Sequence, residues 1–389
     1  MTPQGPTPTG RSAAGSPKEG PSGAAPTGGA PSGAGPTGGA RTGGPGEGRG
    51  PGRAARRRAR RLPPPLPQRD GLDAVRWLVP RDAPAGPAAS MLLARFPALA
   101  DPAATPLADR FTAGEVIDAR GRAWAADDPV VGGDELWFHR ELRPEEVPAE
   151  PLPILFHDEH LLVIDKPHDV ATMPRGAHVL ASALVRLRRD TGIEQLVPLH
   201  RLDRRTAGVL AFGVRPEERS AYQQLFARRE VDKRYEALVL PGPGCTLPQE
   251  VGERTELADR MEKRRGELTA RIVPGAPNAY TELEVLTARG TGVDGTGEAG
   301  TTEDGPSGAC SAESRALLLG LRPRTGRTHQ LRLQLSSRGA PIAGEDLYPE
   351  PCPEPAGPLR LLARSLAFTD PVTGQARVFR SRRRLAALE

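Results

Sequence analysis

Short apolar segments separated by polar turns run through the second half of this chain. Leu161–Ile164 and Val209–Val214 are continuous apolar runs, and Tyr235–Leu240 and Thr281–Leu286 are also apolar enough to predict strands. Each segment has the length of a strand rather than of a helix. The pattern therefore predicts several short strands within one region.

Two segments have helical spacing instead. Leu180, Leu184 and Leu187 recur at helical intervals, and Gly192 fits just past a helix C-terminus. Glu217–Arg229 places its apolar residues on one face in the same way. Helices are therefore predicted between the strands.

The segment around Leu331 fits two elements. Leu331, Leu333 and Leu335 alternate as in a strand, but Thr328 could cap a helix and Gly339 could end it. Leu331 and Leu335 would then lie one turn apart. With either element, the sum is an α+β fold: a mixed, largely antiparallel sheet with flanking helices and a cleft across it.

Low-complexity sequence bounds this region. The chain has 45 Gly and 43 Pro, and residues 1–66 read as a disordered leader, because they lack the apolar surface needed to offset ordering entropy. The leader ends in a basic run of Arg53, Arg56, Arg57, Arg58, Arg60 and Arg61. That run fits either a solvated tail or a nonspecific phosphate-binding arm. A second such stretch, at about 290–314, reads as an insertion between two neighbouring strands.

Residues 67–148 form a smaller region of their own. Ser90–Phe96 predicts a short helix, Phe111–Gly121 predicts a strand, a turn and a strand, and Gly132–Phe138 predicts another strand. Residues 149–389 would then be one catalytic domain.

Charge and cysteine content narrow the setting. The formal net charge is +5, which suits a polyanionic partner. The three cysteines are far apart, which argues against a zinc site or disulfide framework and favours a reducing compartment. No run approaches the length of a membrane span, and the N-terminus lacks the apolar core of a signal peptide. We expect a cytoplasmic protein.

The run His200–Leu210 sets a single carboxylate, Asp203, among basic residues just before an apolar segment. Nearby positive charge favours the ionised form of an acid. An aspartate in a turn usually accepts backbone hydrogen bonds and does nothing else. An ionised one at a strand edge can also serve as a nucleophile or an anchor.

Other sequence motifs favour a functional role for Asp203 over a structural one. The run reads H-R-L-D-R-R-T-A-G, Lys233–Tyr235 reads K-R-Y, and Gly326–Arg332 reads G-R-T-H-Q-L-R. These motifs, in this order, resemble the RluA-type family of pseudouridine synthases, whose signatures are H-R-L-D-x-x-T-S-G, K-x-Y and G-R-[ST]-H-Q-[IL]-R. The resemblance runs from about Leu152 to about Pro371.

The resemblance implies an RNA-modifying isomerase without a cofactor. It makes Asp203 the catalytic aspartate, Tyr235 the active-site tyrosine and Arg332 the arginine that pairs with Asp203 in a fork. The expected substrate-binding residues are Lys166, His200, Arg201, Lys233, Arg327, His329 and Gln330. Arg201 would fill the space that the flipped base leaves. The expected partner is rRNA or tRNA, and we expect a monomer.

The resemblance also has departures and an extension. Ala207 replaces the usual hydroxyl residue after Thr206, and Asp169 stands where glycine is usual, although aspartate tolerates left-handed geometry. Residues 67–148 resemble part of the small S4-like RNA-binding module that often precedes these synthases. A lid without RNA contact is the alternative for that region.

Three other functions are weaker. A synthase-like RNA chaperone would require loss of a catalytic residue, and none is lost. A nucleoside or glycoside hydrolase would need a second carboxylate, and Asp165 and Asp346 lie in settings that read as structural turns. His157 and His160 form H-x-x-H, but this spacing alone is a weak metal signal.

Overall fold

The computed structural model describes residues 63–142, 144–176, 178–290 and 315–385. The basic end of the leader and the insertion at 291–314 lie outside the described residues.

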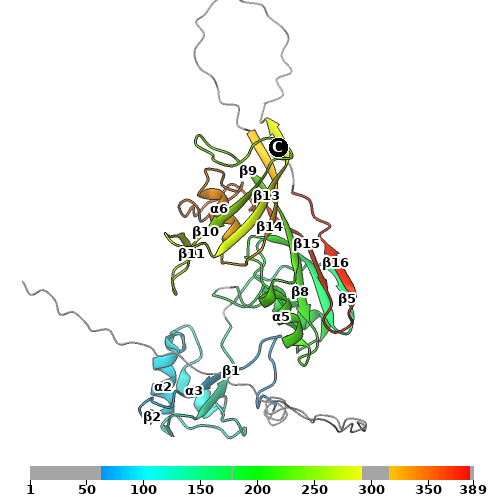
Figure 1. The fold of residues 1–389 in the computed structure, drawn as a ribbon. Helices are drawn as coiled ribbons and strands as arrows, with labels where there is room; N and C mark the ends of the chain where they lie inside the picture. The colour runs from blue at the N-terminus through cyan, green and yellow to red at the C-terminus, as the bar shows by residue number, and fades with distance from the viewer. Residues whose placement is uncertain (1–62, 143, 177, 291–314, 386–389) are drawn as a thin grey trace, which may run out of the picture. The chain divides into compact units, whose positions relative to one another are not determined.

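One ten-stranded sheet forms the framework of the catalytic region (Figure 1). Its strand order is β10-β13-β14-β9-β15-β8-β6-β5, with β16 paired to β15 and β7 paired to β8. Every pair is antiparallel except β15 with β8. The predicted α+β fold with a largely antiparallel sheet is confirmed. The strands are β5 (Ile154–His157), β6 (Leu161–Lys166), β7 (Val197–Pro198), β8 (Ala207–Gly213), β9 (Asp232–Val239), β10 (Arg254–Asp259), β13 (Ala279–Gly290), β14 (Arg315–Pro323), β15 (Leu361–Thr369) and β16 (Ala376–Arg380).

Helices cover both faces of the sheet where the strands are continuously apolar. In β6, Leu162 and Ile164 lie in one buried cluster with residues of α4 (Ala183–Thr191). Leu161 and Val163 lie in another cluster with residues of α5 (Arg219–Arg228). The run does not alternate with polar residues because neither face of this strand meets solvent. Gly192 caps α4 with φ of 70°, as its position predicts.

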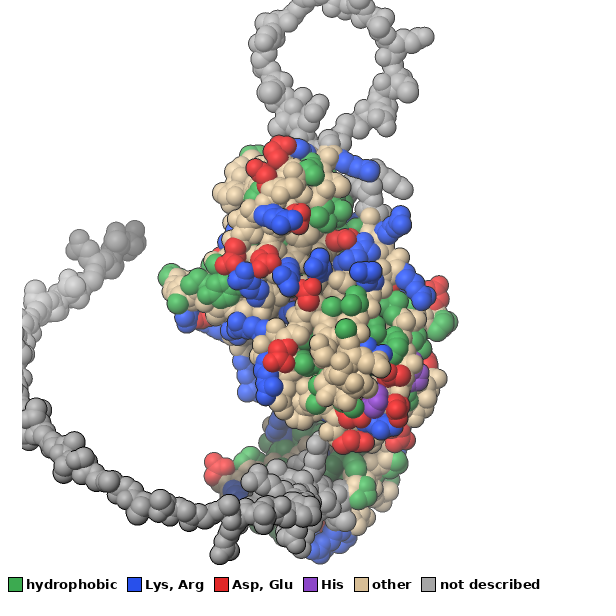
Figure 2. Space-filling model, turned by 45° about the vertical axis from the view of Figure 1, so that its right-hand side comes forward, with side chains coloured by type: hydrophobic (Ala, Val, Ile, Leu, Met, Phe, Trp, Pro, Cys, Tyr) green, Lys and Arg blue, Asp and Glu red, His purple; other side chains and the backbone are tan. Residues whose placement is uncertain are grey.

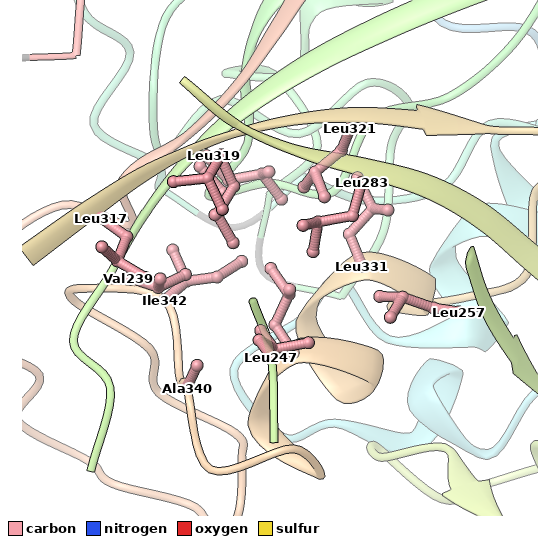
Figure 3. Packing of buried hydrophobic residues seen from close by; sticks show 14 of the residues in the cluster. Val239, Leu247, Leu257, Leu283, Leu317, Leu319, Leu321, Leu331, Ala340 and Ile342 are labelled. Atoms are coloured by element: carbon pink, nitrogen blue, oxygen red, sulfur yellow. The ribbon is translucent and has the colours of Figure 1, made fainter. Parts of the chain in front are cut away.

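The helix α6 (Gln330–Ser336) resolves the ambiguous leucine pattern. Leu331 and Leu335 are buried one turn apart in the cluster formed with β13 and β14 (Figure 3). The N-cap is His329, with φ of 55° and no side-chain capping bond, so the predicted cap at Thr328 is wrong. The two strands that flank the insertion pair with each other, as predicted.

Gly208 explains the glycine of the T-A-G motif. It lies in β8 where that strand meets β15 in parallel, opposite Ala363. Its φ is +113°, and a Cβ atom there would lie 2.2 Å from the Ala363 carbonyl oxygen. Only glycine fits, because the backbones must approach closely at this junction.

The smaller region has its own core, formed around Leu92, Phe111, Val116, Trp124 and Leu136. Its elements are β1 (Val75–Leu78), β2 (Gly86–Pro87), α2 (Ala88–Arg95), the 3₁₀ helix η1 (Pro97–Ala100), α3 (Leu107–Thr112), β3 (Pro129–Val130) and β4 (Glu135–Phe138). The helix near Ser90 and the strand near Phe138 are confirmed.

The predicted strand at Phe111 is wrong. It belongs to α3, which starts after Pro106 and buries Leu107 and Phe111 one turn apart. The missed signal was the proline before this apolar pair. Ile117 forms only isolated bridges, to Ala123 and Trp137.

A two-stranded hairpin, β11 (Met261–Glu262) and β12 (Arg271–Ile272), completes the described elements. None of the helices in the described ranges is long and apolar enough to cross a membrane.

Candidate active site

A cleft of about 940 Å³ brings the sequence motifs together. Its walls include the H-R-L-D loop, the start of β9 and the loop that precedes α6. Of the ten predicted site residues, nine line it: His200, Arg201, Asp203, Lys233, Tyr235, Arg327, His329, Gln330 and Arg332. Three segments that lie far apart in the sequence therefore converge on one site.

Asp203 lies on the loop that leads into β8. Its side chain is 22% exposed, and Nε2 of His329 lies 4.0 Å from its Oδ1. The neighbouring Leu202 is anchored by Thr172, whose hydroxyl donates to the Leu202 carbonyl at 2.8 Å and accepts from its N–H at 3.1 Å. The loop is thus fixed to the core while the carboxylate faces the cleft.

Lys166 lies behind this loop and not in the cleft. It is fully buried, and Nζ donates to the carbonyls of Pro167, Val170 and Arg204 at 2.8, 2.8 and 3.0 Å. Burial lowers the pKa of its ammonium to about 7, against the attraction of nearby carboxylates that include Asp203. The predicted substrate contact is corrected to a structural role, because all three donors are used by the backbone.

His200 is held on the cleft wall in its neutral form. Its Nε2 accepts the Ala211 N–H at 3.2 Å, and its ring stacks on Phe226 with centroids 5.1 Å apart. Burial, with a smaller effect of the Lys233 charge, lowers the pKa of His200 to about 3. Because Nε2 is an acceptor, Nδ1 carries the proton.

Tyr235 and Lys233 enter the cleft from β9. Burial and the negative charge of Asp203 both raise the pKa of Tyr235, so its phenol stays protonated at neutral pH. The Lys233 Nζ donates to the Thr325 carbonyl at 3.4 Å. Its pKa is lowered by burial and by the charge of Arg229.

His329 faces Asp203 from the other wall. Its left-handed backbone is uncommon for a residue other than glycine, and its Nδ1 lies 3.0 Å from the Tyr348 hydroxyl. Burial lowers the pKa of His329, although the charge of Asp203 acts in the opposite direction. The imidazole is therefore biased towards its neutral form beside the carboxylate.

Gln330 stabilises the loop before α6 from within. Its amide nitrogen donates to the Tyr280 carbonyl and the Thr281 hydroxyl at 3.0 and 2.9 Å. Its oxygen accepts from the Thr325 hydroxyl and the Arg327 N–H at 2.8 and 3.0 Å. With these four partners inside the protein, Gln330 holds the loop in place, and its predicted substrate contact stays a prediction.

Arg332 is placed at the site, but its predicted fork with Asp203 is wrong. Its Nε donates to both carboxylate oxygens of Glu345, at 3.1 and 2.9 Å, and its Nη2 donates to Glu345 and to Asp346. Burial is the largest effect and lowers the pKa of Arg332, but the bonds and charge of Glu345 and the charge of Asp346 together outweigh it and raise the pKa. The effect of Asp203 on the Arg332 pKa is smaller.

The sequence motifs assign no role to Glu345, and to Asp346 only that of a second acid in a hydrolase. Both follow Gly344, whose φ is +77° and whose added Cβ would lie 2.4 Å from the Pro358 carbonyl oxygen. In the sequence, the available signal for this turn was a glycine followed by two adjacent acids, because the turn requires glycine at its first position.

The other acid considered, Asp165, lies in a strand and not in a turn. It is buried in β6 and accepts hydrogen bonds from the Ser381 hydroxyl and the Arg382 N–H, each at 2.8 Å. His160 interacts with Glu218 through Nδ1, at 2.9 Å. In the part of the chain that the structure describes, no cluster of three or more histidine, cysteine and acidic residues is arranged to hold a metal.

Comparison with known proteins fits this geometry. Residues 160–337 match the family model for RNA pseudouridylate synthase. The dual-specificity RNA pseudouridine synthase RluA of Haemophilus influenzae is 29% identical over 240 residues, which cover 60% of this chain and 95% of the relative. The tRNA pseudouridine synthase C of Vibrio cholerae is 28% identical over 242 residues, covering 59% of this chain and 90% of the relative.

These similarities define the class of protein as an isomerase that acts on uridines in RNA. Within that class, the chain is similar to the RluA-type pseudouridine synthases.

Proposed function

We propose that this chain converts specific uridines in structured rRNA or tRNA stem-loops to pseudouridine, with Asp203 as its catalytic aspartate. The convergence of Asp203, Tyr235 and His329 on one cleft carries the proposal. The relatives support the substrate class, because their names describe one dual-specificity RNA enzyme and one tRNA enzyme. The proposal includes a cytoplasmic monomer that needs no metal or redox cofactor.

The reaction breaks the N-glycosidic bond of uridine and rejoins the base to the sugar through carbon. A carboxylate nucleophile is a common way to divide such a step into two easier ones. Asp203 is exposed enough to reach a ligand and is held by a fixed loop. Attack on the sugar, attack on the base and assistance of elimination are all compatible with this position.

A uridine in a stem-loop must leave its stack to reach this carboxylate. The cleft volume, about 940 Å³, is within the range of small-ligand pockets and can admit a nucleotide. In our proposal, the flat ring of Tyr235 stacks on the flipped uracil. Its protonated hydroxyl is then available as a donor. Arg201, which is exposed at the rim, would occupy the vacated space in the RNA.

The arginines and lysine at the cleft rim fall into two sets, according to whether a carboxylate forms an ion pair with them. Arg322 is paired with Asp232 at the rim, and Arg324 is paired with Glu282 and with Glu256. Figure 2 shows Lys and Arg side chains gathered across one face, many of them beside Asp or Glu.

The second set has no carboxylate within salt-bridge distance among the described residues: Arg201, Arg229, Lys233 and Arg327. Arg327 donates instead to a neutral carbonyl, that of Asn278, at 3.2 Å. Cations without a protein counter-charge are the ones that gain most from a phosphate. We therefore assign the RNA backbone contacts to Arg229, Lys233 and Arg327, while Arg201 keeps its place in the space that the flipped base leaves.

Salt dependence tests the assignment. Replacing Arg229 or Arg327 with alanine should reduce the slope of log Kd against log salt by about 0.7–0.9 per lost phosphate contact. Arg322→Ala and Arg324→Ala are matched controls from the same rim and should leave the slope unchanged. Equal slope changes in both sets would contradict the assignment.

Activity is tested with the purified chain on ribosomal and transfer RNA, by chemical mapping of pseudouridine. Wild type should modify discrete uridines, and Asp203→Asn should bind the same RNA without modifying it. Binding without modification by wild type would favour the RNA-chaperone function instead.

The smaller region, residues 67–148, is proposed to be an S4-like RNA-binding module. Arg95 ends helix α2, and Arg120 is exposed in a turn of the same region. Replacing both with alanine should weaken RNA binding. Unchanged binding would favour the lid without RNA contact.

A further inference from the structure

Arg205, two residues after Asp203, is a buried arginine that the proposed reaction has not used. It is 6% exposed, and its Nη2 donates to the Gly357 carbonyl at 2.5 Å. Its Nη1 forms an ion pair with Asp346, 3.2 Å from Oδ1, without a hydrogen bond. The Asp203 loop is thereby tied to the turn that contains Asp346.

The same carboxylate oxygen also contacts Arg332. Oδ1 of Asp346 accepts a hydrogen bond from Arg332 Nη2, while Glu345 holds the rest of the Arg332 guanidinium. Asp346 therefore joins an arginine of the Asp203 loop to an arginine of α6. These two segments form two walls of the cleft.

The charges in this cluster show what the link through Asp346, here called the joint between Arg205 and Arg332, does for the site. The guanidinium groups of Arg205 and Arg332 face Glu345 and Asp346, and Arg205 Nε also lies 3.9 Å from Oδ1 of Asp169. Because Glu345 and Asp346 hold both arginines, neither is locked onto Asp203. The carboxylate of Asp203 is therefore not covered by a fork and remains open to substrate.

We propose that Asp346 is a positioning residue, which fixes Arg205 and Arg332 together and so sets the Asp203 loop against α6. The inference rests on the proposed pseudouridine synthase function. It assigns Asp346 and Arg205 no contact with RNA. Their effect should therefore fall on the rate of the bound complex and not on RNA affinity.

A double-mutant cycle tests this joint. The variants are Arg205→Met, Asp346→Asn and the two combined, measured by single-turnover pseudouridine formation at saturating RNA. Each single variant should lose about 30-fold in rate, as expected for a charged contact. The double variant should be no slower than the slower single variant, because both remove the same link. The Kd for RNA should stay within about 2-fold of wild type.

Arg204→Met is the matched control. Arg204 is the neighbouring arginine of the same loop, but it pairs with Asp169 at 2.9 Å near the surface, with side chains 40% and 51% exposed. Its single-turnover rate at saturating RNA should match wild type, because exposed ion pairs contribute little. Thermal unfolding by circular dichroism must show that every variant is folded at the assay temperature.

The outcomes separate the hypotheses. Losses that multiply in the double variant, weaker RNA binding with an unchanged rate, or an equal loss in Arg204→Met would overturn the joint. If the neutral variants do not fold, Arg205→Lys and Asp346→Glu keep the charges, change the reach and complete the same cycle. A wild type that forms no pseudouridine on any RNA defeats the proposed function, whereas an active wild type with unaffected variants defeats only the joint.

Discussion

Replacing Glu345 with glutamine would remove the main counter-charge of a buried arginine while keeping the side-chain shape. The side chains of Glu345 and Arg332 are only 3% and 4% exposed. Glu345 also accepts the N–H groups of Asp346 and Leu347 at 3.1 and 2.9 Å. Breaking a buried ion pair costs about 3–5 kcal/mol.

Two features of the site reduce this cost. Asp346 remains as a second partner of Arg332, and the glutamine oxygen can still accept one bond. We therefore expect Glu345→Gln to lower the free energy of unfolding by about 2–3 kcal/mol, the range for hydrogen bonds to charged groups.

Urea unfolding followed by circular dichroism measures this loss by linear extrapolation. Glu284→Gln is the control, because Glu284 faces Arg254 across β10 and β13 in a pair whose side chains are 39% and 73% exposed. The control should lose no more than about 0.5 kcal/mol. Equal losses in the two variants would refute the reasoning that burial makes the Arg332 network strong.

Three further predictions follow from the structure and the sequence. The folded pKa of His200 is about 3 against a reference of 6.5. As pH falls through this interval, His200 is protonated first in the unfolded chain, so the free energy of unfolding drops by up to about 1.4 kcal/mol per pH unit. In urea unfolding, His200→Gln should lack this contribution to the pH dependence. An unchanged pH dependence in the variant would count against a buried, neutral His200. Lys166→Met should lower the free energy of unfolding by at least about 2 kcal/mol in the same assay, because buried carbonyls lose their partner. Its RNA affinity, measured by filter binding, should be unchanged. Unchanged stability with weaker RNA binding would show that Lys166 contacts the substrate after all. Deletion of residues 1–61 should preserve folding and turnover, and lost turnover would show that the leader is needed.

Much of the fold could be predicted because local patterns and burial agree. The apolar run of β6 and the Gly192 cap of α4 specify their elements without tertiary information. The leucines of α6 fit two periods, and only packing against β13 and β14 decides for the helix. At Phe111, the helix-starting proline outweighed the strand pattern.

The site was predicted less evenly, because a motif gives residue types but not the directions of side chains. Asp203 and Tyr235 line the cleft, whereas Lys166 lies behind it and bonds to backbone carbonyls. Gln330 lines the cleft, but its amide bonds to groups that lie elsewhere in the sequence. Arg332 binds the acids of a distant turn, at Glu345 and Asp346. No local pattern predicts that partnership, since it depends on how the 344–348 turn packs against α6.

The most direct test of the central claim is pseudouridine mapping of total RNA from a strain that lacks this protein. The strain would be complemented with wild type or with Asp203→Asn at equal protein level. The account predicts that at least one pseudouridine disappears in the deletion and returns only with wild type. Restoration of that pseudouridine by Asp203→Asn would contradict the proposed role of Asp203 as the catalytic aspartate.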